Sequence, residues 1–163
     1  MIGSMTRTAR LALAVTAALT LAACARTNPD EAGVGGAGLG AGGVAPGSAQ
    51  DFARAAGDRV FFESDSSELT STAQATLDKQ AAWLTRYPNV SAVIEGHADE
   101  RGTREYNIAL GARRAAVVVN YLVSRGVNQG RITSKSFGKE RPVAICNDIS
   151  CWSQNRRAVT VVQ

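Results

Sequence analysis

The chain has 163 residues, of which 45% are hydrophobic and 20% charged, and its formal net charge at pH 7 is +4. Two cationic residues, Arg7 and Arg10, lie in an N-terminal segment that has the features of a cleaved leader, and without it the net charge is near +2. The basic balance therefore gives little support to a nucleic-acid partner, and none is expected. A single histidine in the whole chain argues against a zinc site built from several histidines.

The N-terminus has the parts of a secretory signal. The two arginines precede Leu11–Leu21, which is apolar apart from two threonines and too short to span a bilayer. The following Leu21-Ala22-Ala23-Cys24 resembles the lipobox of bacterial lipoproteins, in which the cysteine is acylated and becomes the new N-terminus. We predict a signal peptide over residues 1–23 and lipidation of Cys24. The alternative is an ordinary signal with an incidental cysteine.

Export and acylation have consequences for location and for the other cysteines. Three acyl chains anchor a protein stably, because each buried CH₂ contributes about 0.8 kcal/mol. Ala25, rather than Asp, follows the cysteine, which indicates the outer membrane by the sorting rule of enteric lipoproteins. In an oxidising compartment Cys146 and Cys151 are expected to form a disulfide. A zinc pair is the alternative, but the spacing lacks the usual C-x₂-C form.

Residues 24–57 are predicted to form a flexible linker. Between residues 33 and 43 the chain is almost entirely glycine and alanine, with no hydrophobic periodicity. Such a segment buries too little surface to offset the cost of ordering it. Its reach of roughly 30 Å lets the following domain act at a distance from the membrane.

Residues 58–163 are predicted to form one domain. A first helix is expected after a Ser71–Gln74 capping box, and it ends before Pro88. A second is expected over residues 104–125, with Gly126 following it. The face predicted for this second helix carries Tyr106, Leu110, Val117 and Tyr121. Strands are expected at residues 60–62, 90–97, 131–137 and 157–162, with a loop over 138–154 pinned by the cysteines.

The order β-α-β-α-β-β favours an α+β fold, a two-layer sandwich with the helices on one face of the sheet. Its second strand and second helix are joined by Gly96-His97-Ala98-Asp99-Glu100-Arg101-Gly102-Thr103. This turn combines charged side chains with the N–H groups of a helix start, so it is a candidate site for an anion or a zwitterion. Arg114 lies fifteen positions beyond Asp99, and that spacing alone does not bring the two together.

Several ordered motifs give the chain a family resemblance over about residues 58–163. Besides the turn, they are Tyr106-Asn107, Leu110-Gly111-x-Arg113-Arg114-Ala115, Phe137-Gly138-Lys139-Glu140-Arg141-Pro142 and Asn155-Arg156-Arg157. Together they resemble the OmpA-like peptidoglycan-binding domain. The turn, the lipobox and the glycine-rich linker are similar to the peptidoglycan-associated lipoproteins of this family. The residues Cys146, Cys151 and Trp152 are similar to those of the alphaproteobacterial members of the family.

The resemblance implies a ligand, the meso-diaminopimelate of peptidoglycan stem peptides, whose free end carries an ammonium and a carboxylate on one carbon. It implies that Asp99 binds the ammonium and that Arg114 binds the carboxylate in a bidentate clamp. Arg101 and Asp65 are implied as further contacts, and Leu110 as an apolar contact for the methylene chain.

One position departs from the family pattern. Ser64 stands before Asp65 where many members have Phe or Tyr, so an aromatic wall is missing on that side. The motif Asn155-Arg156-Arg157 has two interpretations, a basic patch for an anionic surface or a structural link between the last strand and the second helix.

The resemblance also implies a role without catalysis or cofactor. TolB is the implied protein partner, in the Tol–Pal system that helps the outer membrane follow constriction during cell division. An enzyme is disfavoured because the chain has no Gly-x-Ser-x-Gly and no histidine set for zinc, and Asp99 with Glu100 on one turn makes a poor glycosidase pair. The alternative is a wall-binding lipoprotein of the same family outside the Tol–Pal system, such as an adhesin or a secretion-machine anchor.

Overall fold

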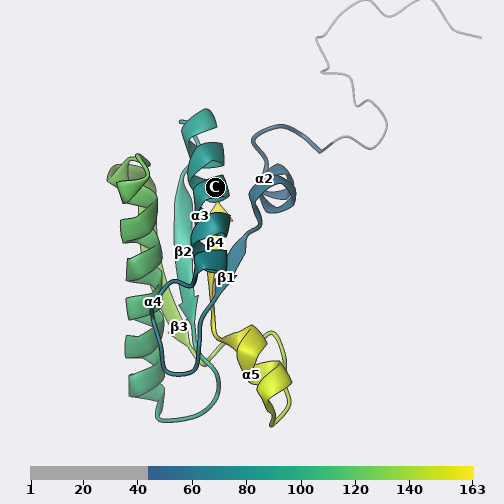
Figure 1. The fold of residues 1–163 in the computed structure, drawn as a ribbon, viewed down its shortest axis with the longest axis vertical. Helices are drawn as coiled ribbons and strands as arrows, with labels where there is room; N and C mark the ends of the chain where they lie inside the picture. The colour runs from purple at the N-terminus through teal and green to yellow at the C-terminus, as the bar shows by residue number, and fades with distance from the viewer. Residues whose placement is uncertain (1–43) are drawn as a thin grey trace, which may run out of the picture. The chain divides into compact units, whose positions relative to one another are not determined.

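A four-stranded sheet lies at the centre of the computed structural model, which describes residues 44–163 (Figure 1). The strand order is β1-β4-β2-β3, and β4 runs antiparallel to both of its neighbours, whereas β2 and β3 are parallel. The strands are β1 (Arg59–Phe61), β2 (Ala92–His97), β3 (Ile132–Gly138) and β4 (Arg157–Val162). The predicted signal peptide, Cys24 and most of the predicted linker lie outside the described residues.

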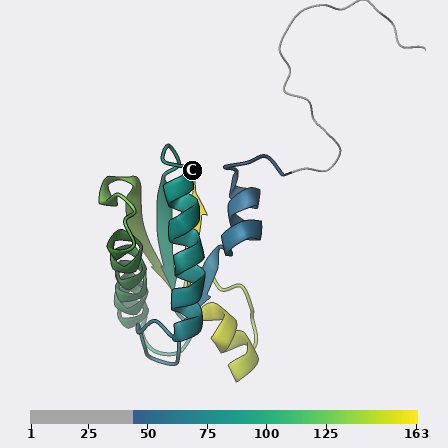
Figure 2. The same cartoon turned by 45° about the horizontal axis from the view of Figure 1, so that its top comes forward.

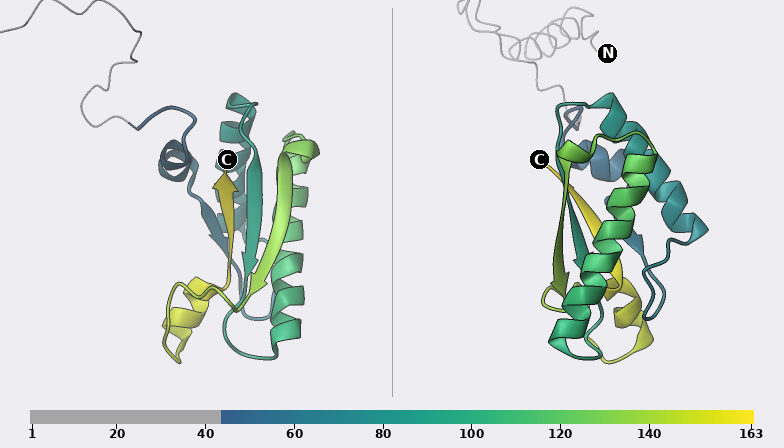
Figure 3. Two further views of the ribbon diagram at one scale, coloured as in Figure 1. Left: turned by 180° about the vertical axis from the view of Figure 1, so that it is seen from behind. Right: turned by 90° about the vertical axis from the view of Figure 1, so that its left-hand side faces the viewer.

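Helices α3 and α4 lie side by side over one face of the sheet (Figure 2), and the view from behind shows the strands with no helix in front of them (Figure 3). The helical elements are α2 (Ala49–Ala56), α3 (Ser71–Arg86), α4 (Arg104–Ser124), the 3₁₀ turn η1 (Gln129–Arg131) and α5 (Ile149–Asn155). The predicted α+β sandwich with its helices on one face is confirmed. Within residues 44–163, no helix has the length and apolar character needed to cross a membrane.

The core fills the space between the two long helices and the sheet. Its fully buried side chains include Leu77 and Leu84 from α3, Val118 and Leu122 from α4, and Ile94 from β2. Each such side chain stabilises the fold by about 1.5–3 kcal/mol relative to an exposed one. This packing fixes α4 on β2, and so it also fixes the turn that joins them.

Two local predictions differ from the structure in detail. The N-cap of α3 is Thr70, whose hydroxyl accepts a hydrogen bond from the Ala73 N–H at 3.2 Å, so the cap is one residue earlier than the predicted Ser71. On α4 the buried face contains Asn107 and Arg114, whereas Tyr106 is 43% exposed. A pattern that counts only apolar residues does not predict this face, because its polar side chains are buried with hydrogen-bond partners.

Helix α2 lies inside the range predicted as linker, so that prediction is wrong at its C-terminal end. Ser48 caps the helix by accepting a hydrogen bond from the Asp51 N–H at 3.2 Å. Phe52 is 1% exposed and packs edge-on against Trp83, with 4.9 Å between ring centroids. A capping serine and one aromatic anchor are sufficient here because α3 supplies the surface on which the helix packs.

All but the last residue of helix α5 lies in the range predicted as a loop, so that prediction is wrong there. Asp148 caps it through a 2.7 Å hydrogen bond to the Ser150 N–H, and a disulfide joins Cys146 to Cys151 in its first turn. Seven residues are too few to show an amphipathic period, which explains why the sequence pattern did not predict the helix.

Helix α4 approaches the sheet closely at two glycines. A Cβ on Gly96 of β2 would lie 1.9 Å from the carbonyl oxygen of Gly111, and a Cβ on Gly111 would lie 2.9 Å from the Gly96 oxygen. No side chain fits at either position without moving the helix away from the strand. The two glycines therefore let α4 pass directly over the end of β2.

We predict that Gly96→Ala destabilises the protein by at least about 2 kcal/mol, because the added methyl group must push α4 outward. Urea denaturation of the variant measures the change in the free energy of unfolding. Gly130→Ala is the matched control, since a Cβ there meets only the Asn128 side chain at 3.3 Å, and its expected change is within about 0.5 kcal/mol. Equal stability of the two variants would contradict the close packing.

His97, at the end of β2, is buried as a neutral side chain. It is 2% exposed and stacks on Phe137 with 5.5 Å between ring centroids, and neither ring nitrogen has a hydrogen-bond partner among the described residues. Burial, together with the charges of Arg157 and Arg141, lowers the pKa of His97 to about 4. The imidazole is therefore uncharged at pH 7 and serves as scaffold.

This shift predicts a loss of stability in acid. Between about pH 6.5 and 4 the unfolded state binds a proton on His97 that the folded state rejects, so the free energy of unfolding falls as pH decreases, by up to about 3 kcal/mol. His97→Phe keeps an aromatic contact and removes the titration. Urea denaturation at about pH 7 and about pH 4.5 is expected to show a smaller acid loss in the variant. The same loss in both proteins would mean that His97 is not buried neutral.

Candidate functional site

Three segments meet at one end of the sheet and form a pocket there. They are the β1–α3 connection, the β2–α4 turn and the first turns of α4, all at the end of the domain opposite to the C-terminus (Figure 1). The pocket has a volume of about 230 Å³ and is lined by Ser64, Asp65, Asp99, Arg101, Gly102, Tyr106, Asn107 and Leu110. Of the five ligand residues that the resemblance implies, four line this pocket, and only Arg114 does not.

Asp99 is held as a carboxylate beneath the surface of the pocket. It is 7% exposed, and Arg101 donates to both of its oxygens, from Nη2 at 2.7 Å and from Nε at 3.1 Å. Arg156 donates to it from Nη1 at 3.4 Å. Burial favours the neutral acid, but the hydrogen bonds and charges of Arg101 and Arg156 outweigh it and lower the pKa of Asp99 below the usual value. At neutral pH the pocket therefore contains a negative charge.

Arg101 is oriented by contacts on several sides. Besides Asp99, its guanidinium donates to the Ser64 hydroxyl at 2.9 Å and stacks over the ring of Trp152, with 4.4 Å from Cζ to the ring centre. Ser64, where the family pattern has an aromatic residue, thus supplies a hydrogen-bond acceptor. Hydrogen bonding to Asp99 raises the pKa of Arg101 above its usual value. The arginine is a fixed cation at the mouth of the pocket.

Asp65, from the β1–α3 connection, is a second acidic residue that lines the pocket. Its backbone is in the left-handed region, with φ of 55°, which aspartate tolerates better than most residues. The Tyr106 hydroxyl donates a hydrogen bond to its carboxylate, and this bond raises the pKa of Tyr106. The first turn of α4 and the β1–α3 connection are thereby joined across the pocket.

The β2–α4 turn itself is held by hydrogen bonds to its backbone. Asn107 is buried and donates from Nδ2 to the carbonyl oxygens of Arg101 at 2.7 Å and Thr103 at 3.1 Å. Thr103 caps α4 by accepting from the Tyr106 N–H, and Lys139 donates to the Gly102 carbonyl at 2.7 Å. These contacts give a structural role to two motifs that the family resemblance includes, Tyr106-Asn107 and the one that contains Lys139.

Arg114 lies under the pocket and is completely buried. Its guanidinium donates to three backbone carbonyls, those of Ser66 at 2.8 Å, His97 at 2.8 Å and Glu63 at 3.1 Å. Burial lowers the pKa of Arg114 to about 10, against the opposing effect of Asp99, so the side chain stays charged at neutral pH. Within residues 44–163 it forms no ion pair with Asp99, whose arginine partners are Arg101 and Arg156. An alanine at this position would therefore disturb the fold as well as the pocket.

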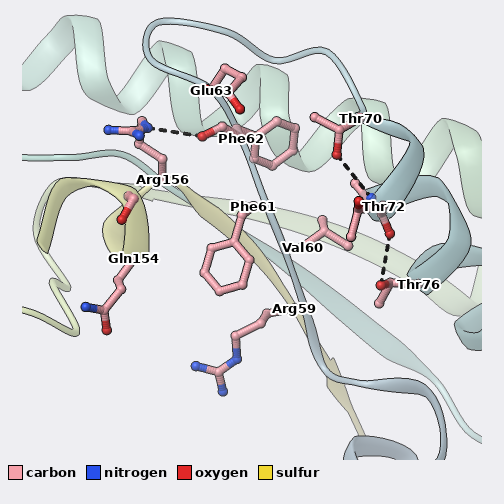
Figure 4. A pocket seen from close by; sticks show the side chains of 12 residues that line it. Arg59, Val60, Phe61, Phe62, Glu63, Thr70, Thr72, Thr76, Gln154 and Arg156 are labelled. Atoms are coloured by element: carbon pink, nitrogen blue, oxygen red, sulfur yellow. Dashed lines mark hydrogen bonds between the residues drawn. The ribbon is translucent and has the colours of Figure 1, made fainter. Parts of the chain in front are cut away.

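Two residues that the sequence pattern did not indicate, Arg156 and Trp152, contact this site. Arg156 is buried at the end of α5, where Nε donates to the Phe62 carbonyl at 3.0 Å, as Figure 4 shows, and Nη1 reaches Asp99. It therefore links the last strand to the end of β1, and not to the second helix as one interpretation proposed. The Asn155-Arg156-Arg157 motif indicated a structural role for these residues, but it did not indicate that Arg156 contacts Asp99.

Two larger cavities lie next to this pocket, and neither is lined by Asp65, Asp99, Arg101 or Leu110. One, of about 470 Å³, runs along β1 between α3 and the end of α5, and among its lining residues only Glu63 is acidic (Figure 4). The other, of about 410 Å³, lies beside the disulfide loop and is mostly apolar. No three His, Cys, Asp or Glu side chains come together as a metal site within residues 44–163. Of the three, the smallest pocket is the one lined by the buried carboxylate of Asp99 and by Arg101, which is bonded to it.

Comparisons with known proteins place the chain in a family. Residues 61–156 match the model of the OmpA family. The chain is 60% identical over 152 residues to the peptidoglycan-associated lipoprotein of Rhizobium meliloti, covering 93% of this chain and 85% of that protein. It is 59% identical to that of Agrobacterium fabrum, covering 92% and 85%.

A solved structure agrees with these sequence matches. The crystal structure of the peptidoglycan-associated lipoprotein from Burkholderia pseudomallei is similar with a TM-score of 0.64 and 42% identity, over 65% of this chain and 90% of that one. The fold, the family match and the relatives all lead to the same assignment. The chain belongs to the OmpA family and, within it, to the peptidoglycan-associated lipoproteins.

Proposed function

We propose that this protein is an outer-membrane lipoprotein that binds peptidoglycan noncovalently through the pocket at Asp99 and so tethers the outer membrane to the cell wall. The observation that carries the proposal is a small pocket lined by an ionised carboxylate, Asp99, and by Arg101, with Arg156 bonded to the same carboxylate from outside the pocket. The names of the relatives support the choice of ligand, since they are called peptidoglycan-associated. Binding without turnover is the proposed activity, and no catalytic role is assigned.

The proposed ligand is the free end of meso-diaminopimelate in the stem peptide. Its ammonium would bind the Asp99 carboxylate, and its carboxylate would lie near Arg101, whose side chain is 45% exposed. Leu110 offers an apolar contact for the methylene chain. A pocket of about 230 Å³ is smaller than the sites of drug-sized molecules, so it suits an amino-acid end better than a disaccharide.

Arg114 and Asp65 take supporting roles in this proposal. The buried charge of Arg114 gives the pocket a positive potential that favours the ligand carboxylate. Three of its five N–H groups are used by backbone carbonyls, and direct contact with ligand requires a shift of the segment at residues 63–66. Asp65 would be a second attraction for the ammonium.

The domain organisation that we propose places this pocket within reach of the wall. Residues 1–23 would be the signal peptide, and Cys24 would carry the lipid. A linker would run from there to the cap of α2 at Ser48, with a reach of roughly 25–30 Å. The membrane anchor confines the domain near its ligand and raises the effective concentration for binding.

We predict that Asp99→Asn abolishes pelleting with purified peptidoglycan of the diaminopimelate type. Removing one partner of a buried charge pair costs roughly 2–5 kcal/mol, which corresponds to a loss of at least about 30-fold in affinity. Asp78→Asn is the matched control, because it makes the same change at a half-exposed carboxylate on α3 and should bind like the wild type. Both variants are made in the unacylated chain that begins at residue 24 and carries Cys24→Ser.

Peptidoglycan with lysine in place of diaminopimelate tests the ligand itself. Lysine lacks the second carboxylate, so pelleting of the wild-type chain should be weak with this wall. Unchanged pelleting of Asp99→Asn would refute the site, and equal binding to both walls would refute the ligand. Release of soluble fragments from the wall would show an enzyme instead of a tether.

We also propose TolB as the protein partner, within the Tol–Pal system, with a role in outer-membrane invagination during division. Support comes from relatives of 55–60% identity that are named peptidoglycan-associated lipoproteins and that match 92–93% of this chain. A surface for TolB that overlaps the wall site would make the two partners exclude each other. The alternative is a wall-binding lipoprotein outside this system, with the same pocket and no contact with TolB.

A pull-down with TolB from the same cells separates these two functions. We expect the immobilised chain to retain TolB, and soluble peptidoglycan fragments to release it in a dose-dependent way. The Asp99→Asn variant should keep TolB in the presence of the fragments, because it no longer binds them. Failure of the wild-type chain to retain TolB would favour the alternative.

A further inference from the structure

The disulfide-bonded segment before β4 reaches into the proposed ligand site through one aromatic residue. Trp152 of α5 stacks on the guanidinium of Arg101, with 4.4 Å from Cζ to the ring centre. Its indole Nε1 donates a hydrogen bond to the carboxylate of Glu100. Trp152 thus contacts both residues that follow Asp99, from about fifty positions further along the chain.

These contacts restrict a side chain that would otherwise be mobile. Arg101 is half-exposed, and a long side chain of this kind has many rotamers of similar energy. The ring of Trp152 covers one face of the guanidinium, the Ser64 hydroxyl lies at its tip and Asp99 accepts from its edge. In this orientation the cation is already beside the carboxylate that would bind an ammonium.

Helix α5 depends on contacts outside itself to hold Trp152 in place. A helix of seven residues is not stable alone. The disulfide fastens its first turn at Cys151, the residue before Trp152, to Cys146 in the preceding loop. The last residue of the helix is Asn155. Its side chain accepts a hydrogen bond from the Val143 N–H at 2.9 Å and donates one to the Ala144 carbonyl at 2.8 Å. The helix is therefore clamped to the same loop at both ends.

We propose that Trp152 is a positioning residue that acts through Arg101, and that the Cys146–Cys151 disulfide sets the affinity for peptidoglycan by holding Trp152 against it. The proposal rests on the proposed function of the pocket. Without the ring, Arg101 is held only by Asp99 and Ser64, and its guanidinium takes other orientations more often. The ligand carboxylate then loses a preorganised cation, and binding weakens without loss of the ammonium site.

The test measures binding of the unacylated chain to diaminopimelate-type peptidoglycan over a range of wall concentrations. Trp152→Leu should weaken binding about 2- to 10-fold, as expected for loss of a cation–π contact. Trp152→Phe should retain most of the affinity, because it keeps an aromatic face for Arg101. In an Arg101→Ala background, Trp152→Leu should have no further effect.

Each result decides between defined alternatives. If Trp152→Leu binds peptidoglycan with wild-type affinity while Asp99→Asn does not bind, this inference is overturned and the proposed function stands. Additive losses in the double variant would also overturn it, because Trp152 would then act without Arg101. Unchanged binding by Asp99→Asn would overturn the proposed function and this inference together. Thermal unfolding of each variant identifies any loss that comes from unfolding.

The disulfide is tested separately with the double variant Cys146→Ser, Cys151→Ser. It should weaken binding as Trp152→Leu does, and it should have no effect once Arg101 is alanine. Treatment of the wild-type chain with dithiothreitol should give the same loss, and reoxidation should restore the affinity. If the double variant binds like the wild type, the disulfide has no part in setting the affinity.

Discussion

The arrangement of the site depends on one buried charge, the guanidinium of Arg114. A charge removed from water is costly unless hydrogen bonds compensate it. Here the compensation comes from the carbonyls of Glu63 and Ser66 in one segment and of His97 in another. The same bonds that make the burial of Arg114 tolerable fasten the β1–α3 connection to the end of β2. The positions of Asp65 and of the Asp99 turn follow from that attachment.

Close packing of α4 on the sheet makes this possible. Gly111 lies between Leu110 and Arg114 on the buried face of α4, and its contact with Gly96 brings the helix directly against β2. A helix held further away would not bring the guanidinium to the His97 carbonyl. The position of Arg114, and of the pocket above it, therefore depends on the close contact between the two glycines.

The charges around Asp99 explain why a zwitterion suits the pocket. Arg101 and Arg156 keep the carboxylate ionised, and Arg114 adds a third positive charge below. A ligand with only an ammonium would meet these cations as well as the carboxylate, and a ligand with only a carboxylate would meet Asp99. A group that carries both charges on one carbon can satisfy both, which is the physical basis of the proposed selectivity for diaminopimelate.

The sequence by itself determined the long helices, the strands and the order of these elements along the chain, because hydrophobic periodicity and chain breakers are local properties. Helices α2 and α5 were not predicted because both are short and depend on tertiary contacts. Helix α2 is held by Phe52 packing on Trp83, and α5 by the Cys146–Cys151 disulfide. The family resemblance supplied the five candidate ligand residues, and four of them line one pocket. Only the tertiary structure decided that Arg114 bonds to backbone carbonyls, that Arg101 contacts Trp152 of α5, and that Asp99 contacts Arg156 just after it. Those contacts join segments 17 to 57 residues apart, and their geometry is set by the order of the strands in the sheet and by helix packing, which no local pattern contains.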